Sequence, residues 1–105
     1  MNEKIHQLIE ELKTALRNSF DDFEGLYLYG SQVNGISNEN SDIDIVVIID
    51  AKAKEKRYAI WSIVSLLNYK YDMLLDLQPM TRQELERNYI FYNEVVNKGI
   101  FYAAA

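Results

Sequence analysis

Residues 29–49 read YGSQVNGISNENSDIDIVVII, and this stretch decides the fold. The run that follows Asp44 is β-branched on both alternating faces, which predicts a central strand covered on both sides. The short aromatic and aliphatic run of residues 25–29 lies between two glycines and predicts another strand. Gly30 and Ser31 begin a loop rich in Gly, Ser and Asn. The stretch therefore predicts two strands joined by a polar loop.

Helical periodicity flanks these strands. Apolar residues recur at helical spacing over residues 5–20, which predicts an amphipathic helix of roughly four turns. Residues 52–71 show a similar pattern and have the right length for a crossover helix, which leads to a third strand over residues 72–78 that Pro79 ends. Residues 81–84 match a capping box that opens a further helix, continuing to Lys98-Gly99. The predicted fold is α/β (α+β), a small mixed sheet with helices packed on it.

Composition limits the class of protein. The chain has 105 residues and no internal repeat or linker, so one domain over residues 1–105 is expected. A formal net charge of -5 argues against a broad nucleic-acid-binding surface. The absence of cysteine excludes a disulfide framework and a thiolate zinc site. The sequence shows neither the apolar core of a signal peptide nor the ~18 apolar residues of a membrane span, so a cytoplasmic protein without membrane contact is expected.

Two acids at the start of the central strand are candidate metal ligands. Asp42 and Asp44 are two residues apart, so in a strand their carboxylates leave the same face about 6–7 Å apart at the backbone. They can therefore converge on one hard divalent cation such as Mg²⁺. The same pair is also compatible with a turn at Ser41 and a solvated strand entrance, and further evidence is needed to separate these interpretations.

That evidence lies upstream of the loop. Gly30 and Ser31 allow backbone N–H groups and the Ser hydroxyl to approach a phosphate closely, and a short helical turn beginning at Ser31 would add its positive end. A Gly-Ser pair after a strand is by itself a common turn. A phosphate cradle that faces paired carboxylates across residues 32–41, however, is the layout required for phosphoryl or nucleotidyl transfer.

Two other motifs fail on the same residues. A P-loop requires Lys where Ile36 stands, and a long helix where this chain has a strand. An EF-hand calcium loop would place Ile43 at its obligatory glycine position and Ile49 at its terminal Glu position. Neither kind of site is therefore expected.

Gly30-Ser31, ten further residues, Asp42-x-Asp44 and the aliphatic run together resemble the DNA polymerase β-type nucleotidyltransferase superfamily. Within it the chain is most similar to the small bacterial minimal nucleotidyltransferases (MNT), and the likeness covers nearly the whole chain. The family pattern also has a third carboxylate on a later strand, which Asp76 matches. Asp72 shares the strand face of Asp76, but its place at the strand entrance fits a turn cap better.

The resemblance implies transfer of AMP from ATP to an acceptor hydroxyl, with two Mg²⁺ ions, or Mn²⁺ in their place. It also implies that Asp76 helps to activate the acceptor hydroxyl. Many relatives have Arg where this chain has Gln32 and Asn34, so one phosphate-stabilising charge is missing. The residues assigned to catalysis and metal binding are Asp42, Asp44 and Asp76. The residues assigned to nucleotide binding are Gly30, Ser31 and Ser41.

A chain this short has little room for an acceptor domain, so the acceptor is expected to be held by a second protein. The resemblance implies a toxin–antitoxin pair in which this chain adenylylates a HEPN-type ribonuclease toxin, commonly on a tyrosine. Two other functions stay open. One is an antitoxin that acts by occlusion alone, which the missing Arg near Ser31 favours. The other is a small-molecule nucleotidyltransferase, although such enzymes generally carry an additional substrate-binding domain.

The remaining polar and aromatic residues have simpler interpretations. His6 lies among charged neighbours and is expected at the surface. The Lys and Arg residues of the segment 52–57 are expected on a solvated face. Aromatic residues outside the motif are expected to pack in the core and at its rim rather than form a nucleobase platform; they are Trp61, Tyr58, Tyr69, Tyr71, Tyr89 and Tyr92.

Overall fold

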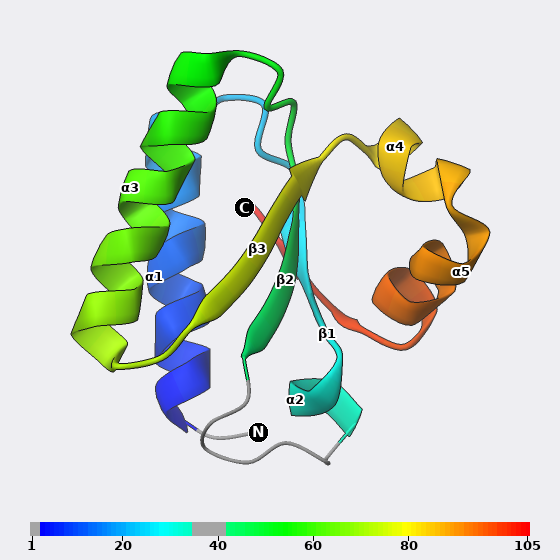
Figure 1. Ribbon diagram of the computed structural model, residues 1–105, viewed down its shortest axis with the longest axis horizontal. Coiled ribbons are helices and arrows are strands. Elements are labelled where there is room, and N and C mark those ends of the chain that lie inside the picture. Colours follow the sequence, from blue (N-terminus) through cyan, green and yellow to red (C-terminus); the bar gives the residue numbers. More distant parts are fainter. Residues whose placement is uncertain (1–2, 35–41) are drawn as a thin grey trace.

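The computed structural model describes residues 3–34 and 42–105. Within these ranges the chain forms a four-stranded mixed sheet with helices on both faces (Figure 1), which confirms the predicted α/β class. The strand order is β3-β2-β1-β4; β2 is parallel to β3, and β1 is antiparallel to both β2 and β4. The strands are β1 (Gly25–Tyr29), β2 (Ile43–Ile48), β3 (Leu75–Met80) and β4 (Ile100–Ala103).

Two long helices, α1 (Glu3–Ser19) and α3 (Lys54–Tyr71), cover one face of the sheet (Figure 1). The apolar stripe of α1 is buried, as its spacing predicts. It packs with α3 against alternate residues of the central strands, which include Ile43 and Ile45. α3 is the crossover that the parallel strands β2 and β3 require. The main core therefore lies between these helices and the sheet.

Short elements lie against the other face, around a smaller core that includes Val46 and Leu85. The predicted single helix over residues 81–98 is instead divided at Asn88, whose side-chain oxygen accepts a 3.1 Å hydrogen bond from the Phe91 N–H. The capping box at Thr81 is confirmed. The elements of this face are α4 (Arg82–Arg87), α5 (Tyr89–Tyr92) and a π-helical turn η1 (Asn93–Asn97), and α2 (Ser31–Asn34) follows β1.

The third strand begins and ends later than predicted. Asp72 is the C-cap of α3 in a left-handed conformation, with φ 51, which confirms the turn-capping interpretation of this acid. The strand also continues through Pro79 to Met80. Proline is tolerated there because β3 is an edge strand and pairs only with β2, so the missing N–H can face away from the ladder.

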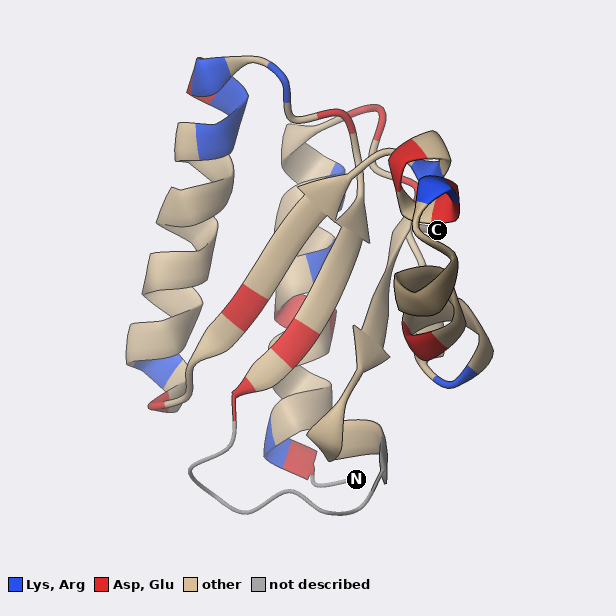
Figure 2. Cartoon of the chain, turned by 45° about the vertical axis from the view of Figure 1, so that its right-hand side comes forward, with Lys and Arg blue, Asp and Glu red and all other residues tan. Residues whose placement is uncertain are grey.

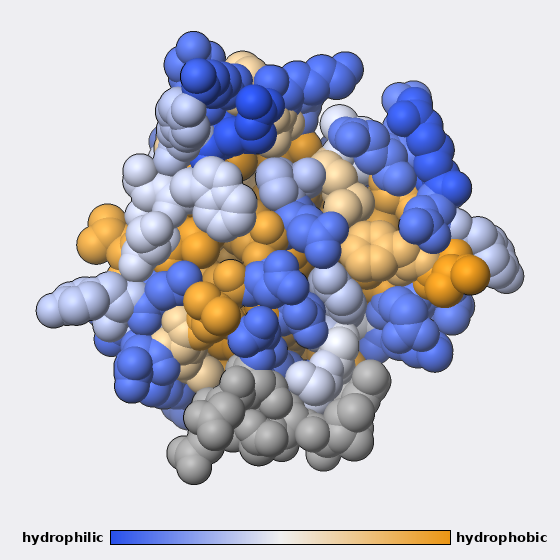
Figure 3. Space-filling view, viewed as in Figure 1, coloured by the Kyte–Doolittle hydropathy of each residue, from blue (hydrophilic) through white to orange (hydrophobic). Residues whose placement is uncertain are grey.

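The expectation that the aromatic residues pack in the core and rim is wrong for several of them. Trp61 on α3 is half exposed, and Tyr69 is 89% exposed. In Figure 3 hydrophilic residues gather at the top, over the start of α3, whereas hydrophobic surface lies in the middle of the same side. His6 is exposed, as expected. None of the described helices is long and apolar enough to cross a membrane.

Candidate functional site

Two of the predicted acids lie side by side on neighbouring strands. Asp44 and Asp76 are register partners in the parallel pair β2–β3. Partners in a parallel ladder project to the same face, and the adjacent residues Ile43 and Ile45 enter the core beneath α1 and α3. Both carboxylates therefore lie on the opposite face, where Figure 2 shows the acidic positions of β2 and β3 next to each other. No Lys or Arg occurs in β1, β2 or β3 to neutralise them.

The electrostatics of Asp44 reflect this crowding. Burial raises the pKa of the Asp44 carboxyl above its ordinary value, and the charges of Asp76 and Asp42 raise it further. A hydrogen bond between the Asp44 and Asp76 carboxyl groups acts in the same direction. The pair therefore favours either a shared proton or a cation between its oxygens.

Asp42 stands at the margin of this pair. It lies directly before β2 and is exposed. Within residues 3–34 and 42–105, no three acidic, His or Cys side chains form a group that could hold a metal ion. The structure thus brings Asp44 and Asp76 together and places Asp42 close enough to act on Asp44 by its charge. The assignment of the three acids as metal ligands stays a prediction.

Gly30 makes room for the Asp44 carboxylate. Its φ is +78, a left-handed conformation that favours glycine. A Cβ at this position would overlap a carboxylate oxygen of Asp44 and lie 3.2 Å from its Cγ. Ser31 begins α2 directly afterwards, so the predicted helical turn is present. Ser41, the third predicted nucleotide-binding residue, lies outside the described residues.

These residues fit a hard divalent cation in their chemistry. Asp44 and Asp76 supply only oxygen donors, which Mg²⁺ and Mn²⁺ prefer. The Asp44 carboxylate occupies the space that a Cβ at Gly30 would fill, so the glycine lets this oxygen donor pack against the end of β1. Asp44, whose carboxyl pKa is raised, and the adjacent Asp76 have no cationic side chain on their own strands, so a bound metal ion would relieve their repulsion.

Tyr29 is a member of this site that the sequence analysis did not single out. It is the register partner of Asp44 in the antiparallel pair β1–β2, so Tyr29, Asp44 and Asp76 form a row across three strands. Burial, together with the charges of Asp44 and Asp76, raises the pKa of Tyr29 to about 12. The phenol is therefore protonated at neutral pH. Its position directly before Gly30 was the only available signal in the sequence.

A pocket of about 370 Å³ lies farther along β3, and one of its lining residues, Gln78, connects it to the face that carries the acids. Gln78 follows Asp76 by two residues on β3, so both side chains project to this face. Phe91, another lining residue, contacts Tyr29: the two rings meet edge-on, with 5.6 Å between centroids and 87° between planes. The lining residues are Gln78, Pro79, Met80, Glu84, Asn88 and Phe91.

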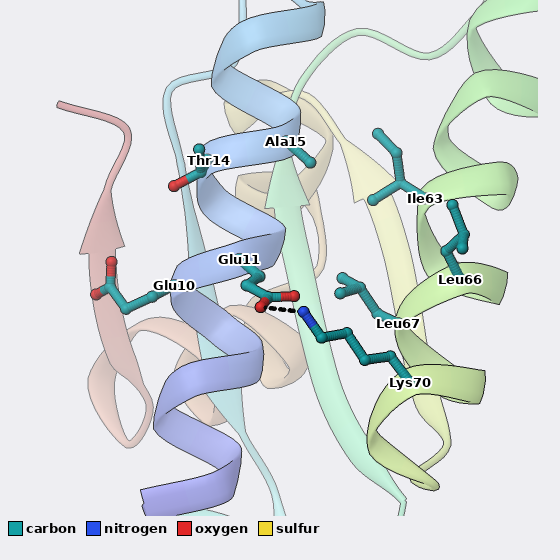
Figure 4. Close-up of a pocket in the computed structure, with 8 residues that line it drawn as sticks. All are labelled: Glu10, Glu11, Thr14, Ala15, Ile63, Leu66, Leu67 and Lys70. Carbon is teal, nitrogen blue, oxygen red and sulfur yellow. Dashed lines mark hydrogen bonds and ion pairs between the residues drawn. The ribbon is translucent and has the colours of Figure 1, made fainter.

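A larger groove of about 530 Å³ lies elsewhere, between α1 and α3 (Figure 4). These helices cover the face opposite the carboxylates. Apolar side chains such as Ile63 and Leu66 line the groove, and the ion pair between Glu11 and Lys70, at 2.6 Å, spans it. The groove contains none of the predicted site residues, so we place the candidate site at the acids rather than in the larger cavity.

The basic residues at the start of α3 lie at the other end of β2 from Asp44. Lys56 Nζ lies 2.7 Å from a carboxylate oxygen of Asp22. Arg57 donates to the backbone carbonyls of Ala51 and Lys52, at 2.9 and 2.6 Å. These two cations therefore stabilise the end of the sheet remote from the acids and do not contribute a phosphate contact.

Comparison with known proteins places this fold among the nucleotidyltransferases, which confirms the resemblance drawn from the sequence. The model of the family described as poly(A) RNA polymerase, mitochondrial-like, central palm domain matches residues 1–88. The chain belongs to this family. A comparison with curated proteins finds no match.

Three solved structures illustrate the similarity. A toxin–antitoxin crystal structure with AMP-PNP contains a chain 29% identical to this one, with 96% of this chain and 72% of that chain covered and a TM-score of 0.60. The structure of the tri-AMPylated Shewanella oneidensis HEPN toxin in complex with the MNT antitoxin matches at 22% identity, with 91% and 69% covered and a TM-score of 0.58. A proposed nucleotidyltransferase from Sulfolobus solfataricus matches at 21% identity, with 96% and 86% covered and a TM-score of 0.56. The last two similarities show the fold alone.

Proposed function

We propose that this chain transfers AMP from ATP to a hydroxyl group of a partner protein, and that the partner is a HEPN-type ribonuclease toxin. The observation that carries the proposal is the pair Asp44–Asp76, held in register beside Gly30 in a chain of this family. The similar toxin–antitoxin structure with AMP-PNP supports a nucleotide and a protein partner. The tri-AMPylated HEPN toxin seen with an MNT antitoxin suggests the chemistry.

Each residue of the site has a role in this reaction. Asp44 and Asp76, with Asp42, would hold two Mg²⁺ ions, for which Mn²⁺ could substitute; bound metal would neutralise phosphate charge and lower the pKa of the acceptor hydroxyl. The backbone of Gly30 and the Ser31 hydroxyl would bind the triphosphate. The acceptor oxygen forms a bond to the α-phosphorus while the bond from that phosphorus to the α–β bridging oxygen breaks. Pyrophosphate leaves, and Asp76 accepts the hydroxyl proton.

A second function, an antitoxin that acts by occlusion alone, has one observation in its favour. The helix α2, which begins at the predicted phosphate cradle, contains no Lys or Arg, because Gln32 stands where many relatives have Arg. A triphosphate held here would have to rely on backbone N–H groups and metal ions for charge neutralisation. AMP transfer and occlusion predict different behaviour for the Asp44→Asn variant.

The experiment incubates the partner toxin with this chain, ATP and Mg²⁺ and measures the mass of the toxin. Wild type should add one or more AMP units, whereas Asp44→Asn should still bind the toxin and react more than about 100-fold more slowly. Asp72→Asn is the matched control, because it makes the same chemical change at a helix cap outside the site. If Asp44→Asn protects cells as well as wild type, and no mass shift appears with either, occlusion is the function.

A further inference from the structure

The pocket lined by Gln78, Asn88 and Phe91 lies along the strand direction from the acids. Gln78 follows Asp76 by two residues of a strand, a displacement of about 6–7 Å. This is comparable with the separation between the α-phosphate and the base of a nucleotide. A nucleotide whose α-phosphate lies at Asp44 and Asp76 therefore has the reach to place its base in the pocket.

The geometry of the proposed transfer gives the nucleotide its direction, and this step rests on the proposed function. Attacking and leaving oxygens lie roughly in line through the reacting phosphorus. Pyrophosphate would leave toward Gly30 at the end of β1, and the acceptor would approach from Asp76 on β3, so this line crosses the strands. The nucleoside is bonded to the α-phosphorus through another oxygen, which lies to the side of the line between the attacking and leaving oxygens. The pocket lies in this sideways direction, along the strands toward α4 and α5, so the nucleoside could extend into it.

The chemistry of the lining suits a base rather than a phosphate. Glu84 is the only charged lining residue, and its negative charge would repel phosphate. Phe91 offers an aromatic ring, while Pro79 and Met80 add apolar surface on the β3 side. Bases stack on such rings. The pocket thus complements the triphosphate cradle at Gly30 instead of duplicating it.

Two side-chain amides supply directional hydrogen bonds. Within the part of the chain that the structure describes, the exposed Gln78 amide makes no hydrogen bond. The Asn88 oxygen is engaged by the Phe91 N–H, which leaves the Asn88 amide hydrogens free to donate. A primary amide with one donor and one acceptor side matches the edge of adenine, where an amino group adjoins a ring nitrogen.

We propose that this pocket is the nucleobase subsite, that it takes adenine, and that Phe91 stacks on the base while Gln78 binds its edge. Both residues determine the specificity for the nucleotide and stand outside the bond-making steps. Their effect should therefore appear in nucleotide binding, and it should be absent for a ligand that has phosphates without a base.

The test measures the affinity of the full chain for ATP, GTP and tripolyphosphate with Mg²⁺ by calorimetry. Phe91→Leu keeps apolar bulk while it removes the ring, and should weaken ATP binding roughly tenfold without a change for tripolyphosphate. Gln78→Leu should reduce the preference for ATP over GTP by a similar factor. Gln83→Leu and Tyr89→Leu are matched controls on exposed sites outside the pocket. Thermal unfolding of each variant checks that it is folded.

The outcomes separate this inference from the proposed function. If ATP, GTP and tripolyphosphate bind wild type with equal affinity, the base makes no contact and the subsite is wrong, while the transfer function stands. Unchanged ATP affinity in both folded pocket variants would overturn the subsite in the same way. If neither ATP nor tripolyphosphate binds with Mg²⁺, the proposed function fails and the subsite fails with it.

Discussion

Ionisation of Asp44 destabilises the folded protein, because burial and two neighbouring acids raise the pKa of its carboxyl group. An acid whose pKa is higher in the folded state binds its proton more tightly there than in the unfolded chain. Its contribution to stability is fully present below its unfolded pKa and is lost as the pH rises through the higher folded value. At neutral pH the carboxylate therefore destabilises the protein in the absence of a cation.

Asp44→Asn should accordingly raise the melting temperature of the metal-free protein at about pH 7. The gain should shrink as the pH falls toward the ordinary pKa of aspartate, about 3.9, because wild type then becomes protonated too. Melting curves of both proteins in EDTA across this range provide the measurement. An Asn variant that melts well below wild type at pH 7 would show that the carboxylate is structural, and its role as a ligand would lose its main support.

For single residues, the sequence was informative where the alternation of a strand or the backbone conformation at a turn restricts which residue can occur. Asp44 and Asp76 lie in strands, as predicted, and Gly30 lies between a strand and a helical turn, as predicted; their pairing in register and the left-handed φ of Gly30 are findings of the structure. Tyr29 and Phe91 were not identified, because their contact joins β1 to α5 across the fold. No local pattern encodes such a contact.

Elements with strong periodicity were predicted well, and those decided by tertiary pairing were not. The long helices α1 and α3 and the strand β2 lie where their patterns place them. β4 was missed because it is a short and largely exposed edge strand, formed through pairing with β1. The helix after Thr81 was predicted as continuous, since the helix pattern does not show that Asn88 ends one helix and caps the next.

The contribution of the capping box that starts α4 to stability can be tested. Thr81 and Glu84 bind each other's backbone N–H groups, at 3.2 and 3.1 Å, and so satisfy donors that the first turn leaves open. Thr81→Ala should lower the free energy of unfolding by about 1 kcal/mol. Thr14→Ala, at an exposed position inside α1, should be neutral or slightly stabilising because Ala favours helix interiors. Urea unfolding of both variants decides; equal effects would mean that the box contributes nothing.

For the whole molecule, charge connects the site to stability. The chain has a net charge of -5, and acids from two strands meet on the face that is proposed to receive a triphosphate. A polyanion and an anionic site repel each other until a cation intervenes. The sequence predicted this much because carboxylates and glycines are local features. It could not define the acceptor, since we propose that the acceptor hydroxyl belongs to another chain.

Binding of ATP should therefore stabilise this protein only when Mg²⁺ or Mn²⁺ is present. A ligand that binds the folded state alone, at about 100 times its dissociation constant, adds about 2.7 kcal/mol. For a chain of this size that corresponds to a rise in melting temperature on the order of 10 °C. ATP with EDTA should give little or no shift, and Asp44→Asn should lose most of the shift with Mg²⁺, whereas Asp72→Asn should retain it.

Because Mg²⁺ alone also relieves repulsion between the acids, the melting temperature with the metal and no nucleotide is the reference, and the shift from ATP is measured relative to it. Equal shifts from ATP with and without the metal would remove Mg²⁺ from the site and leave the three acids without the role proposed for them.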